Sequence, residues 1–125
     1  MKQFINVPSG KKAGVPLTTA IRCGDTLYLS GQTPMDLQTG QIIDGDITVQ
    51  TKQVLENIKL ILDECGSSLE DVVKVTVYLT DLNDFAQFNE VYKLYFKEPY
   101  PVRALVGVNL LFTFKVEIDV IARMD

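Results

Sequence analysis

The 125-residue sequence is long enough for one domain with its own core, and 46% apolar and 22% charged residues are typical of a globular protein. With 16 acidic and 12 basic side chains the net charge is −4, which disfavours a nucleic-acid partner. Histidine is absent, so Ser-His-Asp and Cys-His catalysis are excluded, and the carboxylates and two thiols are a poor set of zinc ligands.

The first half of the chain is expected to hold short strands and a long loop. Two β-prone runs flank the turn residues Gly24-Asp25 and predict a hairpin. Residues 33–46 carry Pro34, Gly40 and Gly45 and are expected to form a loop. The strands are expected at 3–7, 18–23 and 26–30.

An amphipathic helix is expected after this loop, because apolar side chains recur there at helical spacing. Asp46 or Thr48 can cap its start, and Gly66 stands where a glycine ends a helix. The two cysteines lack metal-ligand spacing and are expected to be reduced structural thiols, Cys23 before the hairpin turn and Cys65 packed at the helix end. The apolar stripe consists of Val54, Leu55, Ile58, Ile61, Leu62 and Cys65.

Residues 73–80 alternate strictly, which predicts a strand with one buried face formed by Val73, Val75, Val77 and Leu79. A second helix follows, capped by Asn83 or Asp84 and stopped by Pro99-Tyr100-Pro101. Its aromatic stripe is expected to pack in the core, since no arginine is interleaved as in a base-stacking surface. The stripe comprises Phe85, Phe88, Tyr92 and Tyr95.

Two last strands are expected at 102–110 and 115–123. The order β-β-β-α-β-α-β-β predicts one α+β domain over residues 1–125, a mixed sheet with both helices on one face. The other face is expected to carry Tyr28, Tyr78, Leu105 and Ile121. An apolar face of this kind is usually covered, so we expect a closed symmetric oligomer.

Arg103 and Glu117 are the candidate chemical groups. Arg103 starts a strand with no other charge before Lys115, and a planar carboxylate suits its guanidinium best. Glu117 lies opposite the Val116/Ile118 face, where it can orient a water molecule or transfer a proton. From the residues alone, structural roles are favoured over chemical ones. Arg103 can form a salt bridge with Glu117 or another internal acid, and Glu117 can be a solvated or paired carboxylate.

Several motifs together resemble the Rid (YjgF) family of imine and enamine deaminases. Residues 99–122 resemble its C-terminal signature, roughly P-x-R-x-x-x-x-V, a loop, and V-E-I-[DE]-x-I-A. Ser30-Gly31-Gln32 resembles its S-G-Q segment. Residues 82–85 and 88–92 resemble its D-L-N-D-F and N-x-x-Y/F segments. The motifs follow the family order over nearly the whole chain.

The resemblance implies a chorismate-mutase-like (YjgF-type) homotrimer with ligand clefts between subunits. It implies that Arg103 holds the substrate carboxylate, that Glu117 orients the hydrolytic water, and that Ser30, Gly31 and Asn89 line the cleft. The substrates would be 2-aminoacrylate and related 2-imino acids, and the products 2-keto acids and ammonia. Because an imine carbon is already electrophilic, positioning suffices and no metal or cofactor is expected.

The chain departs from the family pattern at three places. Leu17 replaces a tyrosine of many members, and Leu105 replaces a cysteine or other small residue. The 109–114 loop lacks the usual L-P and is one residue short. The added apolar bulk beside the carboxylate clamp predicts a pocket suited to a bulkier imino acid, with Leu17 and Leu105 among the substrate-binding residues.

Two other functions are open at this point. The cleft can instead serve a regulatory module that binds a small 2-keto acid without turnover, an alternative motivated by Leu17 and Leu105. Ribonuclease or translation-inhibitor activity, also reported in the family, conflicts with the negative charge, the absent histidine and the lack of a basic stripe. No apolar run can span a bilayer and residues 1–6 lack a signal-peptide core, so a cytoplasmic protein without a membrane partner is expected.

Overall fold

The computed structural model describes residues 1–8 and 14–124, and it confirms the predicted order of strands and helices. The predicted 33–46 loop is also confirmed. The helices are α1 (Ile47–Glu64) and α2 (Phe85–Tyr95). The strands are β1 (Lys2–Ile5), β2 (Ala20–Cys23), β3 (Thr26–Leu29), β4 (Val72–Leu79), β5 (Val102–Gly107) and β6 (Val116–Arg123).

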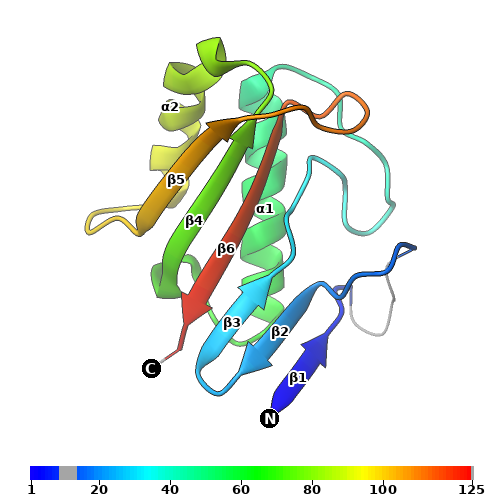
Figure 1. Ribbon diagram of the computed structural model, residues 1–125, viewed down its shortest axis with the longest axis vertical. Helices are drawn as coiled ribbons and strands as arrows, with labels where there is room; N and C mark the ends of the chain where they lie inside the picture. The colour runs from blue at the N-terminus through cyan, green and yellow to red at the C-terminus, as the bar shows by residue number, and fades with distance from the viewer. Residues whose placement is uncertain (9–13, 125) are drawn as a thin grey trace.

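The six strands form one mixed sheet in the order β1-β2-β3-β6-β4-β5 (Figure 1). Strands β4 and β5 are parallel and are joined through α2, while the other neighbours are antiparallel. The β2–β3 hairpin turns at Gly24, whose φ of 59° favours glycine. The last strand in sequence, β6, therefore lies inside the sheet, between β3 and β4.

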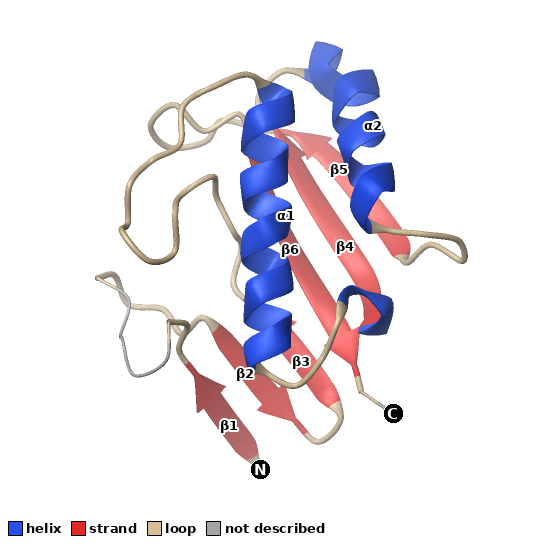
Figure 2. Cartoon of the chain, turned by 180° about the vertical axis from the view of Figure 1, so that it is seen from behind, coloured by secondary structure: helices blue, strands red, loops and turns tan. Residues whose placement is uncertain are grey.

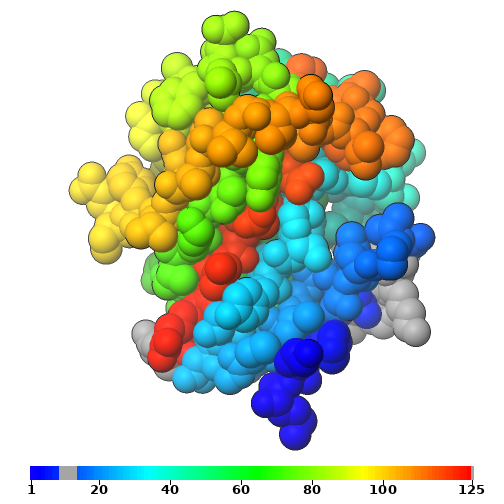
Figure 3. Space-filling model, in the orientation of Figure 1, coloured from blue at the N-terminus to red at the C-terminus, as the bar shows by residue number. Residues whose placement is uncertain are grey.

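Both helices cover the same face of the sheet, as Figure 2 shows from behind, which confirms the predicted α+β architecture. Their apolar stripes and the inward residues of the strands form one core. The other face, seen in the space-filling view of Figure 3, is built from strand residues with no helix over them. Within the described residues, neither helix is both long and apolar enough to cross a membrane.

A β-bulge breaks the expected alternation at the start of β4. Val72 pairs with Ala122 and Lys74 with Ile121, so Val73 is an extra residue on this strand. Val72 is buried and Val73 is 46% exposed. The prediction that Val73 belongs to the buried face was therefore wrong, because the bulge shifts the pleat by one residue.

Helix α1 begins and ends on specific contacts. The cap is Asp46 and not Thr48, since its carboxylate oxygen Oδ1 accepts a hydrogen bond from the Val49 amide at 3.0 Å. Gly66 has a φ of 76° and ends the helix as predicted. Burial raises the pKa of the Cys65 thiol, and Cys65 packs against the core as expected.

The start of α2 differs from the prediction. A 3₁₀ turn (Leu82–Asp84) precedes the helix, and Asp81 caps this turn by accepting a hydrogen bond from the Asn83 amide at 2.9 Å. Asp84 has helical dihedral angles and makes no side-chain cap. Asp84 therefore holds the N-cap position of α2, as predicted, but without a capping hydrogen bond; the side-chain cap found here is that of Asp81 on the preceding turn.

The aromatic stripe of α2 is confirmed in its middle and wrong at its start. Phe88 and Tyr92 are buried, and Tyr92 stacks on Phe96 with ring centroids 4.6 Å apart. Tyr95 is partly buried and packs against the core, whereas Phe85 in the first turn is 45% exposed. The helix turns Phe85 toward the edge of the sheet, where the candidate site lies.

Two buried amide side chains of α1 anchor the loops beside the sheet. Gln50 Nε2 donates to a carbonyl oxygen of the 33–46 loop and to that of Thr113, both at 3.1 Å. Its Oε1 accepts from the Lys115 amide at 2.7 Å. Asn57 donates to two further carbonyl groups between residues 33 and 35. These bonds hold both the 33–46 loop and the segment just before β6 against α1.

Replacing Gln50 with leucine is expected to lower the free energy of unfolding by about 2–4 kcal/mol, because several buried backbone groups lose their partners. Urea unfolding measures the loss. Thr51→Val is the matched control on the same helix, since the buried Thr51 hydroxyl has no hydrogen-bond partner among the described residues. Equal losses in the two variants would contradict the anchoring role of Gln50.

The open face carries three of the four expected apolar residues. Tyr28 is 48% exposed, and Ile121, its register partner, and Tyr78 are partly exposed. The prediction for Leu105 was wrong: Leu105 pairs in parallel register with Val77, which is buried under the helices. Leu105 accordingly packs against the core on the helix side.

Candidate functional site

Arg103 lies on the helix side of the edge strand β5, in register with the buried Val75. Its Nη1 donates a hydrogen bond to Asn89 Oδ1 of α2 at 2.9 Å. Its guanidinium carbon lies 4.8 Å from the ring centroid of Tyr92 and 5.8 Å from that of Phe88. The aromatic rings hold the guanidinium plane, and one amide aligns it.

No acid among the described residues forms an ion pair with Arg103; the ion pair found there joins Lys93 to Glu90. The alternative of a permanent salt bridge between Arg103 and an internal acid is therefore wrong for the acids that the structure describes. Burial raises the pKa of Tyr92 to about 12 although the positive Arg103 lowers it, so the ring beneath is a neutral phenol. A guanidinium without an acidic partner among the described residues is able to bind an external anion.

Glu117 lies on the open face of β6, opposite Tyr78 of β4. Burial raises the pKa of its carboxyl group, and the nearby Asp119 raises it further. A Cβ on Gly31 would overlap Oε2 of Glu117, so the absence of a side chain at Gly31 gives the carboxylate its place. A carboxyl group with a raised pKa accepts and returns a proton more readily near neutral pH.

Ser30 comes directly before Gly31, and its hydrogen bond reaches the residue that follows Leu17. The Ser30 hydroxyl donates to the Thr18 carbonyl oxygen at 2.6 Å, which ties the S-G-Q segment to the chain just after Leu17. Leu17 is 48% exposed. The structure thus brings Gly31 against Glu117 and connects Ser30 to the residue that follows Leu17.

The seven predicted residues fall into two groups. The arginine half-site contains Arg103, Asn89 and Leu105. The glutamate half-site contains Glu117, Gly31, Ser30 and Leu17. Strand β4 separates β5 from β6, and the register places Arg103 on the helix side of the sheet and Glu117 on the open side. Within one chain the two half-sites therefore do not face a common space.

A hollow of about 270 Å³ adjoins the glutamate half-site. Its lining residues, apart from Glu117, were not predicted individually; the one signal was the departure of the 109–114 loop from the family pattern. They are Thr33, Asn109, Leu110, Leu111 and Phe114. The site therefore has an apolar wall beside the carboxylate.

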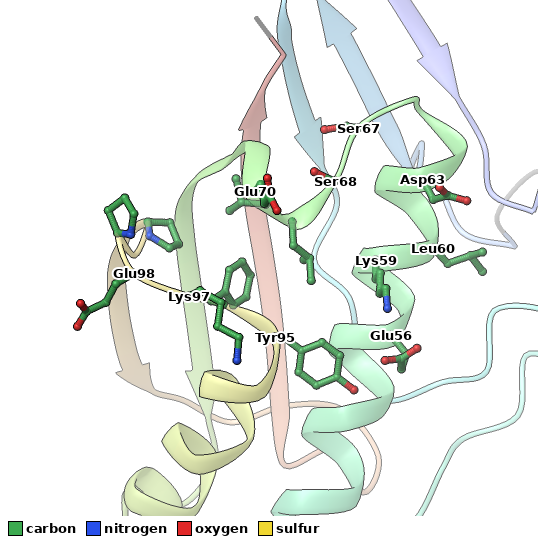
Figure 4. Close-up of a pocket in the computed structure, with 15 residues that line it drawn as sticks. Glu56, Lys59, Leu60, Asp63, Ser67, Ser68, Glu70, Tyr95, Lys97 and Glu98 are labelled. Atoms are coloured by element: carbon green, nitrogen blue, oxygen red, sulfur yellow. The ribbon is translucent and has the colours of Figure 1, made fainter.

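A larger groove of about 920 Å³ lies between α1, the 3₁₀ turn before β4 and the segment after α2 (Figure 4). Glu56 and Lys59 of α1 face Tyr95 of α2 across it. Its lining includes no residue of either half-site. Within the described part of the chain no group of acids and cysteines is arranged to hold a metal ion.

The mixed sheet, its two helices and the motif residues at the two half-sites define a domain of the YjgF type. The chain matches the family model described as Endoribonuclease L-PSP over residues 9–124, and it belongs to this Rid (YjgF) family. The resemblance inferred from the motifs is thereby confirmed.

Two relatives and one solved structure match this chain over nearly its full length. A RutC family protein of Pyrococcus horikoshii is 50% identical over 98% of both chains. A 2-iminobutanoate/2-iminopropanoate deaminase of Dermatophagoides farinae is 36% identical over 99% of this chain and 98% of its own. The crystal structure of Escherichia coli TdcF with bound serine has a TM-score of 0.89 and 39% identity, covering 98% and 99% of the two chains.

Proposed function

We propose that the protein hydrolyses reactive 2-imino and enamine acids to 2-keto acids and ammonia. The observation that carries this proposal is the arginine half-site: a guanidinium on an aromatic surface, aligned by Asn89 and without an acidic partner among the described residues. A 2-imino acid offers the planar carboxylate that such a group binds best. The deaminase among the relatives and the serine in TdcF, itself a small carboxylate, support this substrate class.

The cleft is completed between copies of the chain. The arginine and glutamate half-sites face different sides of one sheet, so a ligand that touches both needs Arg103 from one copy and Glu117 from its neighbour. Exposed apolar residues on the open face, among them Val102 and Val106, give this contact an apolar surface. Two different patches meeting head to tail form a ring, and a homotrimer is the ring proposed here.

Arg103 holds the carboxylate, and Glu117 directs the reaction at the neighbouring carbon. An enamine first takes a proton on carbon and loses one from nitrogen, which makes it an imine. Glu117 takes a proton from water as the water oxygen bonds to the imine carbon and the C=N electron pair moves to nitrogen. The proton returns to that nitrogen and gives a carbinolamine. Glu117 then moves the hydroxyl proton of the carbinolamine to the amine nitrogen, the C–N bond breaks as the C=O bond forms, and ammonia leaves.

An amino-acid oxidase that generates 2-imino acids in the presence of the purified protein provides the test. The rate of 2-keto acid and ammonia release is expected to rise above the rate in buffer. If neither small nor large imino acids respond, deamination is refuted. Binding of 2-keto acids without turnover would then favour the regulatory module.

The family model name gives the second candidate, a ribonuclease. The net charge of −4 and the absence of histidine from the sequence oppose it, because RNA binding depends on neutralising phosphates. A salt titration of RNA binding decides between the two activities. Affinity that persists at physiological salt would support the ribonuclease.

A further inference from the structure

The hollow beside Glu117 has a simple chemical character. Leu110, Leu111 and Phe114 form its apolar part, and Glu117 is the charged group in its lining. A cavity of roughly 150 Å³ is enough for a benzene ring, and this hollow has about 270 Å³. It therefore has room for a branched or aromatic group and opposes a second negative charge.

The loop that forms this hollow is held in place before any ligand binds. Gln50 binds the Thr113 carbonyl, and the Thr113 hydroxyl donates to Asp44 Oδ1 at 2.7 Å. Phe112, the residue before Thr113, has a φ of 52°, a left-handed conformation that costs a non-glycine residue free energy. The two anchors at Thr113 hold this strained residue beside them and keep the wall of the hollow in one shape.

Two apolar side chains of the same loop are largely exposed, whereas Phe114 is buried. Leu111 is 71% exposed and Phe112 is 74% exposed, the latter in an edge-to-face contact with Phe114 at 5.5 Å. Leu111 at the rim of the hollow is thus available to an apolar ligand group that enters beside Glu117.

We propose that this hollow receives the substrate side chain and gives the enzyme a preference for 2-imino acids with apolar side chains of four or more carbons. The inference rests on the proposed function, because it takes Glu117 as the group beside the imine carbon. The imino acid of leucine or phenylalanine would fill the hollow, whereas the methyl group of 2-iminopropanoate would leave most of it empty. Acidic side chains would be rejected by Glu117.

Comparing kcat/KM for the imino acids of alanine, leucine and phenylalanine tests the preference. Each buried carbon contributes roughly fourfold, so the leucine imine is expected to exceed the alanine imine by roughly 50-fold. Leu111→Ser is expected to lower this leucine-to-alanine ratio at least tenfold. Leu94→Ser is the matched control. Leu94 is also an exposed leucine, but it lies on α2 outside the hollow, so this variant should keep the ratio.

The outcomes separate the two proposals. Turnover of all three imino acids at similar kcat/KM, or equal ratios in Leu111→Ser and Leu94→Ser, overturns the side-chain pocket and leaves deamination standing. No turnover of any imino acid overturns the proposed function and the pocket with it. The pocket is supported if wild type has a high leucine-to-alanine ratio of kcat/KM and if Leu111→Ser, but not Leu94→Ser, removes it.

Discussion

Arg103→Lys is expected to lower kcat/KM for a 2-imino acid by about 10²–10⁴-fold. Lysine keeps the positive charge but loses the planar fork, so a carboxylate held by two charge-assisted hydrogen bonds loses roughly 3–6 kcal/mol of binding in the transition state. The bond to Asn89 and the stacking on Tyr92 are lost as well. Steady-state kinetics measures the change, with an imino acid that is soluble enough to saturate the enzyme.

Arg22→Lys is the matched control for this experiment. Arg22 lies on β2, and its Nε donates to the Gly24 carbonyl oxygen at an exposed position. Its replacement is expected to leave kcat/KM unchanged. If Arg103→Lys keeps wild-type activity, or if the two variants lose activity equally, Arg103 does not hold the carboxylate.

Glu117→Gln is expected to lower kcat by about 10²–10⁴-fold, because glutamine cannot take a proton from the attacking water. KM should change less, since Arg103 still binds the carboxylate. In wild type the activity should fall on the acid side at a higher pH than an ordinary glutamate would give, because burial and Asp119 raise the pKa of Glu117. Asp119→Asn removes the nearby negative charge, so the acid limb of the pH–activity profile of this variant should move to lower pH.

The same raised pKa predicts the stability of the Glu117→Gln variant. Above the ordinary pKa of a glutamate, the unfolded chain has an ionised carboxylate, while the folded chain resists ionisation. Ionised Glu117 therefore destabilises the fold as the pH rises through its folded pKa, and this penalty is absent at low pH. Glu117→Gln should melt no lower than wild type at neutral pH. A clear drop in melting temperature would assign the lost activity to misfolding.

The elements were predictable because burial imposes a period on the sequence. The α1 stripe and the β6 alternation each report one buried face. The bulge at Val73 was not predictable, since one extra residue leaves no signal of its own. The capping bond of Asp81 was not predicted, because acids and amides at several adjacent positions suit a cap equally well and the 3₁₀ turn before α2 leaves no separate signal in the sequence.

The candidate site was predictable by residue type and not by arrangement. Arg103 and Glu117 are recognisable from the chemistry they offer and from the family motifs. Their placement on opposite sides of the sheet follows from strand order and register, which one sequence does not state. The prediction that Leu105 lies on the open face was wrong for the same reason, because parallel pairing with Val77 places Leu105 on the helix side of the sheet. The hollow formed by the 109–114 loop could not be predicted, because the sequence does not show how the loop folds beside Glu117.

The most direct test of the shared cleft is recovery of activity in mixed oligomers. Arg103→Ala and Glu117→Gln proteins, each inactive alone, are unfolded together, refolded and checked for mixed assemblies by mass. In randomly mixed rings about one quarter of the clefts join an intact Arg103 to an intact Glu117 of the neighbour. Activity near one quarter of wild type is the predicted result. Mixed assemblies with no recovered activity would contradict a cleft shared between copies.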